Sequence, residues 1–208
     1  MALSLSKDGF FLLLASMAFA RIVQAGDPDI TSDFIFPPNT IAVNESFFTH
    51  TGFRNLVGAA PPAAFKVTKA TLVEFPALSG QSVSYALLQF PAGAINPPHL
   101  HPRSAELLFI MDGCIEVGLI DTTNKLFVQT LQKGDMFLFP KGLVHYLYNI
   151  NAQYPAVALS AFGSANAGSV SIPGTIFASG ITDDVLTKSF KTEIATIQKL
   201  KAGLVPNV

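Results

Sequence analysis

The stretch from Asn96 to Glu106, NPPHLHPRSAE, holds two of the chain's four histidines, His99 and His101, with one residue between them. Side chains two residues apart on a β-strand point to the same face, so both imidazoles can face one cavity. Glu106 follows five residues after His101 and is expected to open the adjacent strand, from which its carboxylate can reach the same point. Imidazole and carboxylate groups that meet at one point form a metal site on chemical grounds.

A third histidine, His145, lies in PKGLVHYLYN, after a Gly-Asp turn and a further strand. In an antiparallel barrel its strand can return beside the first pair. Three imidazoles and one carboxylate on an octahedral ion leave two positions for water, an oxygen species or a bidentate acid. Such ligands suit manganese, iron or nickel, and leave zinc and copper open. The alternative is a set of ordinary histidines and a glutamate without a metal. The fourth histidine, His50, stands alone and is predicted to be structural.

The composition suits one domain with a substantial core, because half of the 208 residues are hydrophobic. Charged residues make up 13% of the chain and nearly cancel, giving a formal net charge of -1. A nucleic-acid partner needs a clustered basic face and is not expected. The chain has a single cysteine, Cys114, which excludes an intrachain disulfide.

The first 25 residues are typical of a secretory signal peptide. Lys7 supplies the positive start, and Phe10–Ala20, FFLLLASMAFA, is apolar but too short to span a bilayer. Small residues predict cleavage after Ala25, and a membrane anchor is the less favoured alternative. The mature chain is therefore expected to be secreted and free of the membrane. The tripeptide that begins at Asn44 is then an N-glycosylation acceptor.

The remaining chain divides into an arm, an all-β domain and a helical tail. Residues 26–66 are rich in Pro and Asn and are expected to form an extended arm with short strands, packed on the domain. Residues 67–180 alternate apolar runs with turn residues every eight to twelve residues or so, which favours a β-sandwich or barrel. The predicted strands cover residues 67–75, 82–90, 106–111, 114–120, 126–131, 136–140, 143–150 and 155–162.

Residues 181–208 are expected to be helical, with Thr182 as the N-cap and a break near Ser189. An apolar stripe follows the second half: Ile194, Ile197 and Leu200. A short amphipathic helix pair cannot bury its stripe alone. We expect it to pack on a neighbouring subunit, with its own barrel as the alternative.

The histidine segments resemble the two motifs of the germin-like proteins, a plant branch of the cupin superfamily. The first motif stands here as Gly93, five residues, His99, Leu100, His101, four residues, Glu106, six residues and Gly113. The second stands as Gly134, five residues, Pro140, Lys141, Gly142, two residues, His145, three residues and Asn149. The resemblance covers about residues 27 to 206. Two complete motifs at matching separation are far more specific than a lone His-X-His.

The resemblance implies a double-stranded β-barrel, or jelly roll, with a helical C-terminal piece. It implies manganese bound inside the barrel by four ligands: His99, His101, Glu106 and His145. It also implies a homo-hexamer, a trimer of dimers joined by the C-terminal helices, and a glycosylated protein of the apoplast or cell wall. The family's usual cysteine pair is missing from the arm, so packing or subunit contacts must anchor it.

For activity, the resemblance favours superoxide dismutation, with a role in defence or cell-wall peroxide production. This reaction needs only an open coordination position and a proton source, for which Glu106 and metal-bound water are candidates. Oxalate oxidases are similar at Asn96, which can hydrogen-bond a substrate carboxylate. They carry a second active-site asparagine where this chain has Ala86, which makes oxalate oxidation the runner-up. The alternative of another class is a non-catalytic wall, storage or receptor-like metal-binding cupin.

Overall fold

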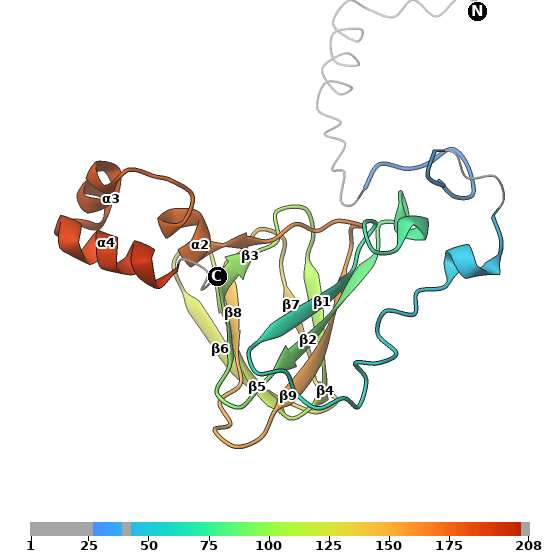
Figure 1. The fold of residues 1–208 in the computed structure, drawn as a ribbon, viewed down its shortest axis with the longest axis horizontal. Helices are drawn as coiled ribbons and strands as arrows, with labels where there is room; N and C mark the ends of the chain where they lie inside the picture. Colours follow the sequence, from blue (N-terminus) through green and yellow to red (C-terminus); the bar gives the residue numbers. More distant parts are fainter. Residues whose placement is uncertain (1–26, 39–42, 205–208) are drawn as a thin grey trace, which may run out of the picture.

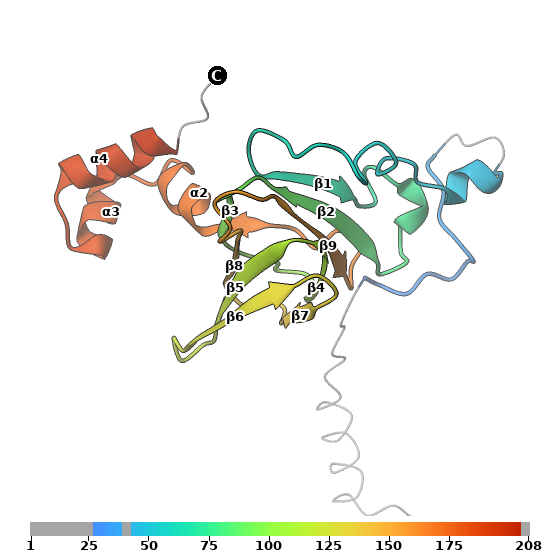
Figure 2. The same cartoon turned by 90° about the horizontal axis from the view of Figure 1, so that it is seen from below.

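Two five-stranded antiparallel sheets face each other and form the body of the molecule (Figures 1 and 2). This computed structural model describes residues 27–38 and 43–204. The predicted signal peptide, residues 1–25, lies outside these ranges and stays a prediction. Within the described ranges, none of the helices has the length and apolar character needed to cross a bilayer.

The first sheet has the order β1-β2-β9-β4-β7, with β1 (Lys66–Ala70), β2 (Ser84–Phe90), β9 (Ala156–Phe162), β4 (Glu106–Asp112) and β7 (Met136–Phe139). The second has the order β10-β3-β8-β5-β6, with β10 (Val170–Ser171), β3 (Ile95–Leu100), β8 (His145–Tyr148), β5 (Cys114–Ile120) and β6 (Leu126–Gln132). Strands distant in sequence are neighbours in both sheets. The predicted all-β jelly roll is confirmed.

The core lies between the sheets and follows the alternation of the strands. In β4, Leu108 and Ile110 are fully buried, whereas Leu107 and Phe109 on the opposite face are exposed. An apolar side chain gains about 1.5–3 kcal/mol when it is fully buried, so this alternation fixes the register of the strand. Glu106 belongs to the inward set of β4, which places a carboxylate at the edge of the core.

Each of the eight predicted strands corresponds to a strand of the structure, and its bounds agree within two residues except at the end of the first. The first predicted strand, 67–75, stops at Ala70, because the Glu74 carboxylate accepts hydrogen bonds from the N–H and the hydroxyl of Thr71 and closes a turn. Strand β3 was not predicted as a separate strand, and β10 and α2 (Ile172–Phe177) were missed. The register of β3 shifts between Asn96 and His99, where two prolines cannot donate to the ladder.

Within its described residues the arm contains no strand before β1 begins at its last residue, Lys66, contrary to the expected short strands. It carries the short 3-10 helix η1 (Glu45–Phe48), and η2 (Pro76–Leu78) follows β1. Its start is anchored by Asp27, whose carboxylate accepts hydrogen bonds from the Ser164 hydroxyl and the Ala165 N–H, both at 2.6 Å. The Asp27 N–H donates to Ser82 at 3.1 Å. Hydrogen bonds therefore hold this arm, which has no cysteine.

The C-terminal segment is helical, as predicted. Helix α3 (Asp183–Phe190) follows the N-cap Thr182, and α4 (Ile194–Gly203) follows a break at Lys191, which adopts a left-handed φ of 51°. Helices α3 and α4 lie against each other and project from the barrel beyond α2 (Figures 1 and 2). Ile197 is fully buried, but Ile194 and Leu200 of the predicted stripe remain exposed. This chain's own barrel therefore does not cover the stripe.

Candidate metal centre

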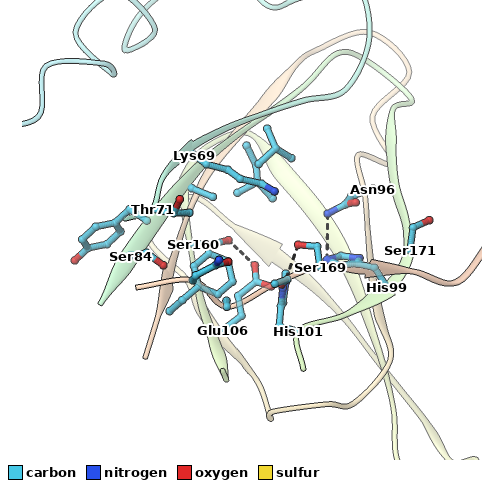
Figure 3. A pocket seen from close by; sticks show the side chains of 18 residues that line it. Lys69, Thr71, Ser84, Asn96, His99, His101, Glu106, Ser160, Ser169 and Ser171 are labelled. Carbon is cyan, nitrogen blue, oxygen red and sulfur yellow. Dashed lines mark hydrogen bonds and ion pairs between the residues drawn. The ribbon is translucent and has the colours of Figure 1, made fainter. Parts of the chain in front are cut away.

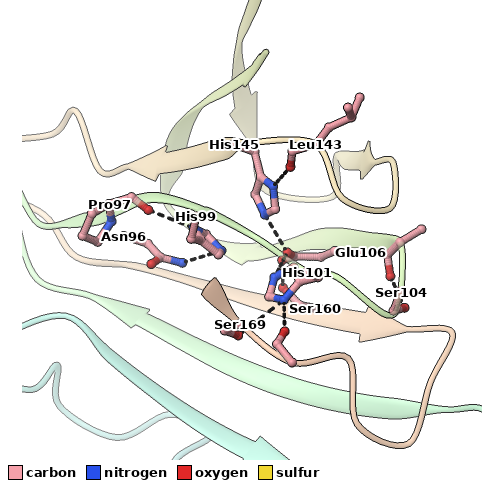
Figure 4. Close-up of polar contacts among 12 residues, drawn as sticks. Asn96, Pro97, His99, His101, Ser104, Glu106, Leu143, His145, Ser160 and Ser169 are labelled. Atoms are coloured by element: carbon pink, nitrogen blue, oxygen red, sulfur yellow. Dashed lines mark hydrogen bonds and ion pairs between the residues drawn. The ribbon is translucent and has the colours of Figure 1, made fainter. Parts of the chain in front are cut away.

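The structure brings together the four side chains that the sequence singled out. His99 in β3 and His145 in β8 are directly paired across the ladder, and His101 follows the end of β3. Glu106 opens β4, which belongs to the other sheet, so the prediction that it would come from the adjacent strand is wrong. The chain crosses between the sheets just before Glu106, and the carboxylate therefore faces the histidines across the barrel (Figure 4).

The four groups form one tight, buried cluster. One ligand atom from each of His99, His101, Glu106 and His145 lies within 4.8 Å of all the others. The relative exposure of these residues is only 1–7%. Oε2 of Glu106 lies 2.9 Å from Nε2 of His101 and 3.1 Å from Nε2 of His145. Buried polar and charged groups destabilise a protein core unless they are hydrogen-bonded, paired with an opposite charge or bound to a metal.

Backbone carbonyls fix the orientation of all three imidazoles. Nδ1 of His99 lies 2.8 Å from the carbonyl oxygen of Pro97, and Nδ1 of His145 lies 2.9 Å from that of Leu143. Nδ1 of His101 lies 2.5 Å from the carbonyl oxygen of Gly168. A carbonyl can only accept, so each Nδ1 carries the proton. In a neutral ring the opposite nitrogen, Nε2, then presents a lone pair to the centre of the cluster.

This arrangement fits a divalent cation. Nε2 of His101 is buried and has no hydrogen-bond partner, although Oε2 of Glu106 is only 2.9 Å away. Two acceptors that face each other at this distance repel unless a cation or a proton lies between them. Nitrogen and oxygen donors that converge from three imidazoles and one carboxylate supply such a cation with four ligands. The residues present therefore fit a resident metal ion.

The electrostatics favour the ligand forms of these side chains. Burial and, to a smaller extent, the nearby His145 lower the pKa of His99 to about 4, so His99 is neutral near pH 7. Burial alone would raise the pKa of Glu106, but its close contacts with His101 and His145 outweigh burial and hold the pKa well below its usual range. A neutral imidazole and an ionised carboxylate are the forms that bind metals.

A serine that the sequence reasoning missed completes the support of the carboxylate. Ser160 of β9 is fully buried, and its hydroxyl donates to Oε1 of Glu106 at 2.5 Å (Figure 4). This bond leaves Oε2 free to face the histidines. The only signal in the sequence was a lone hydroxyl in the apolar run PAVALSAF, on the same face as Ala158. The Gly168 carbonyl that orients His101 had no signal, because any residue offers a carbonyl.

A cavity of about 280 Å³ leads to the cluster (Figure 3). His99, His101 and Glu106 line it, together with Asn96 and Ala86. The Asn96 amide nitrogen lies 3.4 Å from Nε2 of His99, so its amide sits beside the ligand position, as a substrate contact requires. Ala86 lines the same cavity and offers only a methyl group.

The two remaining candidates lie away from the cluster. His50 packs its ring against Phe75, with centroids 5.4 Å apart, and edge-on to Phe53. It is not part of the metal-capable group. Asn44 is exposed and precedes η1, where its side-chain oxygen accepts hydrogen bonds from the N–H and the hydroxyl of Ser46. Its glycosylation stays a prediction.

Comparison with known proteins agrees with the geometry. The cupin family profile matches residues 60–198. Germin-like protein 9-3 of Oryza sativa subsp. japonica is 59% identical over 202 residues, 94% of each chain. Germin-like protein subfamily 2 member 4 of Arabidopsis thaliana is 36% identical, over 95% of this chain and 96% of that protein. The solved structure of oxalate oxidase in complex with the substrate analogue glycolate matches at 28% identity with a TM-score of 0.76, covering 88% of this chain and 100% of that one.

Proposed function

This chain belongs to the germin-like proteins of the cupin family, and from that premise we propose that it is a secreted manganese oxidoreductase that dismutates superoxide. One observation carries the proposal: three imidazoles with fixed Nδ1 protons and one ionised carboxylate converge in a buried cluster beside an open cavity. The four ligands would be His99, His101, Glu106 and His145. Hard and borderline donors without a thiolate suit manganese.

Manganese, when bound, supplies one-electron chemistry between Mn(II) and Mn(III): one superoxide is oxidised to dioxygen, and a second is reduced with two protons to hydrogen peroxide. The protein's own residues do the rest. The Pro97, Gly168 and Leu143 carbonyls hold the imidazoles in their metal-binding tautomer. Ser160 holds Glu106 so that one carboxylate oxygen faces the centre.

Asn96 and Glu106 are the proposed catalytic residues. The Asn96 amide lies beside His99 and can donate a hydrogen bond to a bound oxygen species. Glu106 is kept ionised at neutral pH, so it balances positive charge and can accept a proton in transit. Leu88 and Phe162 give the same cavity apolar lining.

The test uses the purified mature protein loaded with manganese, beside His101→Ala. We expect superoxide dismutation that scales with bound manganese in the parent and is lost in the variant. His50→Ala, which changes a histidine outside the cluster, should keep the activity. A parent that binds manganese but does not dismutate superoxide would contradict the proposal and favour a non-catalytic metal-binding cupin.

Oxalate oxidation is the second candidate, favoured by the likeness to oxalate oxidase and by the position of Asn96. It would convert oxalate and dioxygen to carbon dioxide and hydrogen peroxide. The cavity offers Asn96 as an amide donor, but Ala86 has no polar group with which to hold a carboxylate. We therefore expect no peroxide when the same preparation is given oxalate. Peroxide formation that depends on oxalate would reverse the order of the two candidates.

We also propose that the protein is a homo-hexamer, a trimer of dimers, as the germin family implies. We propose that it acts in the apoplast or cell wall. Four exposed apolar side chains form one patch on β4 and β7, where Leu107 pairs with Leu138 and Phe109 with Met136. The α3–α4 pair adds exposed Phe190. Large exposed apolar patches mark association surfaces.

Light scattering of the mature protein checks this assembly. Leu138→Glu places a charge in the centre of the β4–β7 patch and should yield smaller particles. Lys125→Glu, on an exposed turn, is the matched surface control. A parent that is monomeric at micromolar concentration would contradict the proposal.

A further inference from the structure

We propose that Lys69 forms an anion-recognition site at the mouth of the metal cavity and draws small anions to the metal. The inference deepens the proposed function, because it rests on a metal in the cluster and gives its substrate class as a small anion. Figure 3 shows the Lys69 side chain extending from β1 over the cavity, toward the side of Asn96.

Strand geometry aims Lys69 at the site. Val67 and Lys69 of β1 both line the cavity, as the two-residue period of the strand requires, and Thr71, which follows the strand, lines it too. Lys69 pairs with Ala86 of β2, and Ala86 pairs with Ser160 of β9. These three residues therefore form one row across the sheet, with strands about 4.8 Å apart, that ends at the serine bonded to Glu106.

Ala86 gives this row its open centre. Its methyl group leaves space between Lys69 and Ser160, whereas a longer side chain would fill it. The four-carbon stem of lysine is flexible, so its ammonium group can lean across this gap or extend to solvent. The ammonium group can therefore contact an anion that enters the cavity.

The charge balance of the cavity calls for an anion. Among the side chains that line it, Glu106 is the only carboxylate and Lys69 the only permanent cation. Three neutral imidazoles, one carboxylate and a divalent ion sum to one positive charge, and Lys69 raises the sum to two. No lining acid balances this excess. The cavity therefore attracts small anions and disfavours cations.

Within the described residues, no short ion pair holds the Lys69 ammonium group away from the cavity. None of the salt bridges within the described ranges involves Lys69. Against burial, which raises it, the pKa of Glu74 is lowered mainly by hydrogen bonds from the hydroxyl and the N–H of Thr71, at 2.6 and 3.0 Å, and least by the charge of Lys69. The Lys69 side chain is exposed, so the fold does not depend on its packing.

The test is an azide titration of the manganese-loaded mature protein, followed by the Mn(II) electron paramagnetic resonance signal at low and high salt. Lys69→Gln should raise the azide dissociation constant about three- to tenfold at low salt, from the loss of one unit charge several ångströms from the anion. The difference should shrink as salt shortens the screening length to about 8 Å or less. Lys69→Arg should stay near the parent.

Lys66→Gln is the matched control. Lys66 lies on the same strand and is exposed, but it does not line the cavity. We expect its azide affinity to equal that of the parent. The proposal is overturned if Lys69→Gln binds azide like the parent, if Lys66→Gln weakens azide equally, or if the parent binds no azide.

The outcome is separable from that of the proposed function, because azide binding needs no turnover. Azide binding that depends on Lys69 in a protein without dismutase activity would leave the anion site standing and remove superoxide as its substrate. In an active protein, the second-order rate constant for superoxide should fall in Lys69→Gln and lose its salt dependence.

Discussion

Ser160→Ala tests whether the supporting hydrogen bond, and not the four ligands alone, sets the metal affinity. The Ser160 hydroxyl donates to Oε1 of Glu106 at 2.5 Å, and the two residues are 0% and 2% exposed. Alanine keeps the volume of the site close to that of serine but removes the donor. The carboxylate can then rotate, and Oε1 is left buried without this partner.

The magnitude follows from the burial of this bond. A hydrogen bond to a charged group contributes about 1.5–3 kcal/mol, and about 1.4 kcal/mol corresponds to a factor of ten. We therefore expect manganese affinity to fall about ten- to hundredfold, the range typical for partners of metal ligands. Competition with a chelator of known affinity, monitored by the signal of free Mn(II), measures this change.

Ser84→Ala is the matched control for this experiment. Ser84 is also buried and lines the same cavity, but its hydroxyl donates to the Ser164 carbonyl oxygen at 2.7 Å and not to a ligand. Its loss should cost about 1 kcal/mol of stability and leave the affinity near that of the parent. An affinity of Ser160→Ala within twofold of the parent, in a folded protein, would refute the reasoning.

Three further predictions address stability. At a free metal concentration about one hundred times the dissociation constant, binding adds about 2.7 kcal/mol to the free energy of unfolding. Removing the metal with a chelator should therefore lower Tm by about 5–11 °C in scanning calorimetry. An unchanged Tm would contradict a bound ion. In the metal-free protein, the pKa of His99 is about 4 when folded and 6.5 when unfolded, so the unfolded state binds the proton first as the pH falls. The free energy of unfolding should be constant above pH 6.5 with respect to this group and should decrease by about 3 kcal/mol between pH 6.5 and pH 4. Urea unfolding measures this decrease, which should be absent in His99→Gln. Gly168→Ala should lower Tm more than Gly93→Ala. Both glycines have φ near 70°, but only at position 168 would an added Cβ lie 2.7 Å from the Arg103 guanidinium. Equal decreases in Tm would mean that backbone strain alone determines the loss of stability.

The ligand set could be predicted because each ligand lies at a fixed place in a short motif. His99 lies in β3 and His101 directly follows its end, and the two-residue period of extended backbone puts them on one face. His145 could be added to the predicted set because residues on neighbouring antiparallel strands lie directly opposite each other. In the structure, His99 and His145 are such a pair. The alternation of apolar residues located the strands for the same reason, since burial of one face leaves a periodic trace.

Other features left no such trace. The sheet to which Glu106 belongs depends on a chain crossing, and periodicity along one strand does not report which sheet that strand joins. The end of β1 at Ala70 depends on the Glu74 carboxylate closing a turn, which outweighs the β-branched composition of the next residues. The two-residue β10 and the six-residue α2 are too short for a period to show.

The crossing itself explains the spacing of the first motif. His101 follows β3 of one sheet and Glu106 begins β4 of the other, so the four residues between them must span two sheets that lie about 10 Å apart. Five residue steps reach about 17 Å when fully extended, which leaves little slack for a chain that must also turn. The N–H of Arg103 donates to the Ala167 carbonyl oxygen at 3.1 Å, and its side chain donates to Asn166, which ties this crossing to the loop that orients His101 through Gly168. A short, tethered crossing thus sets a carboxylate from one sheet against imidazoles from the other, and a cation bound between them joins both sheets of the barrel.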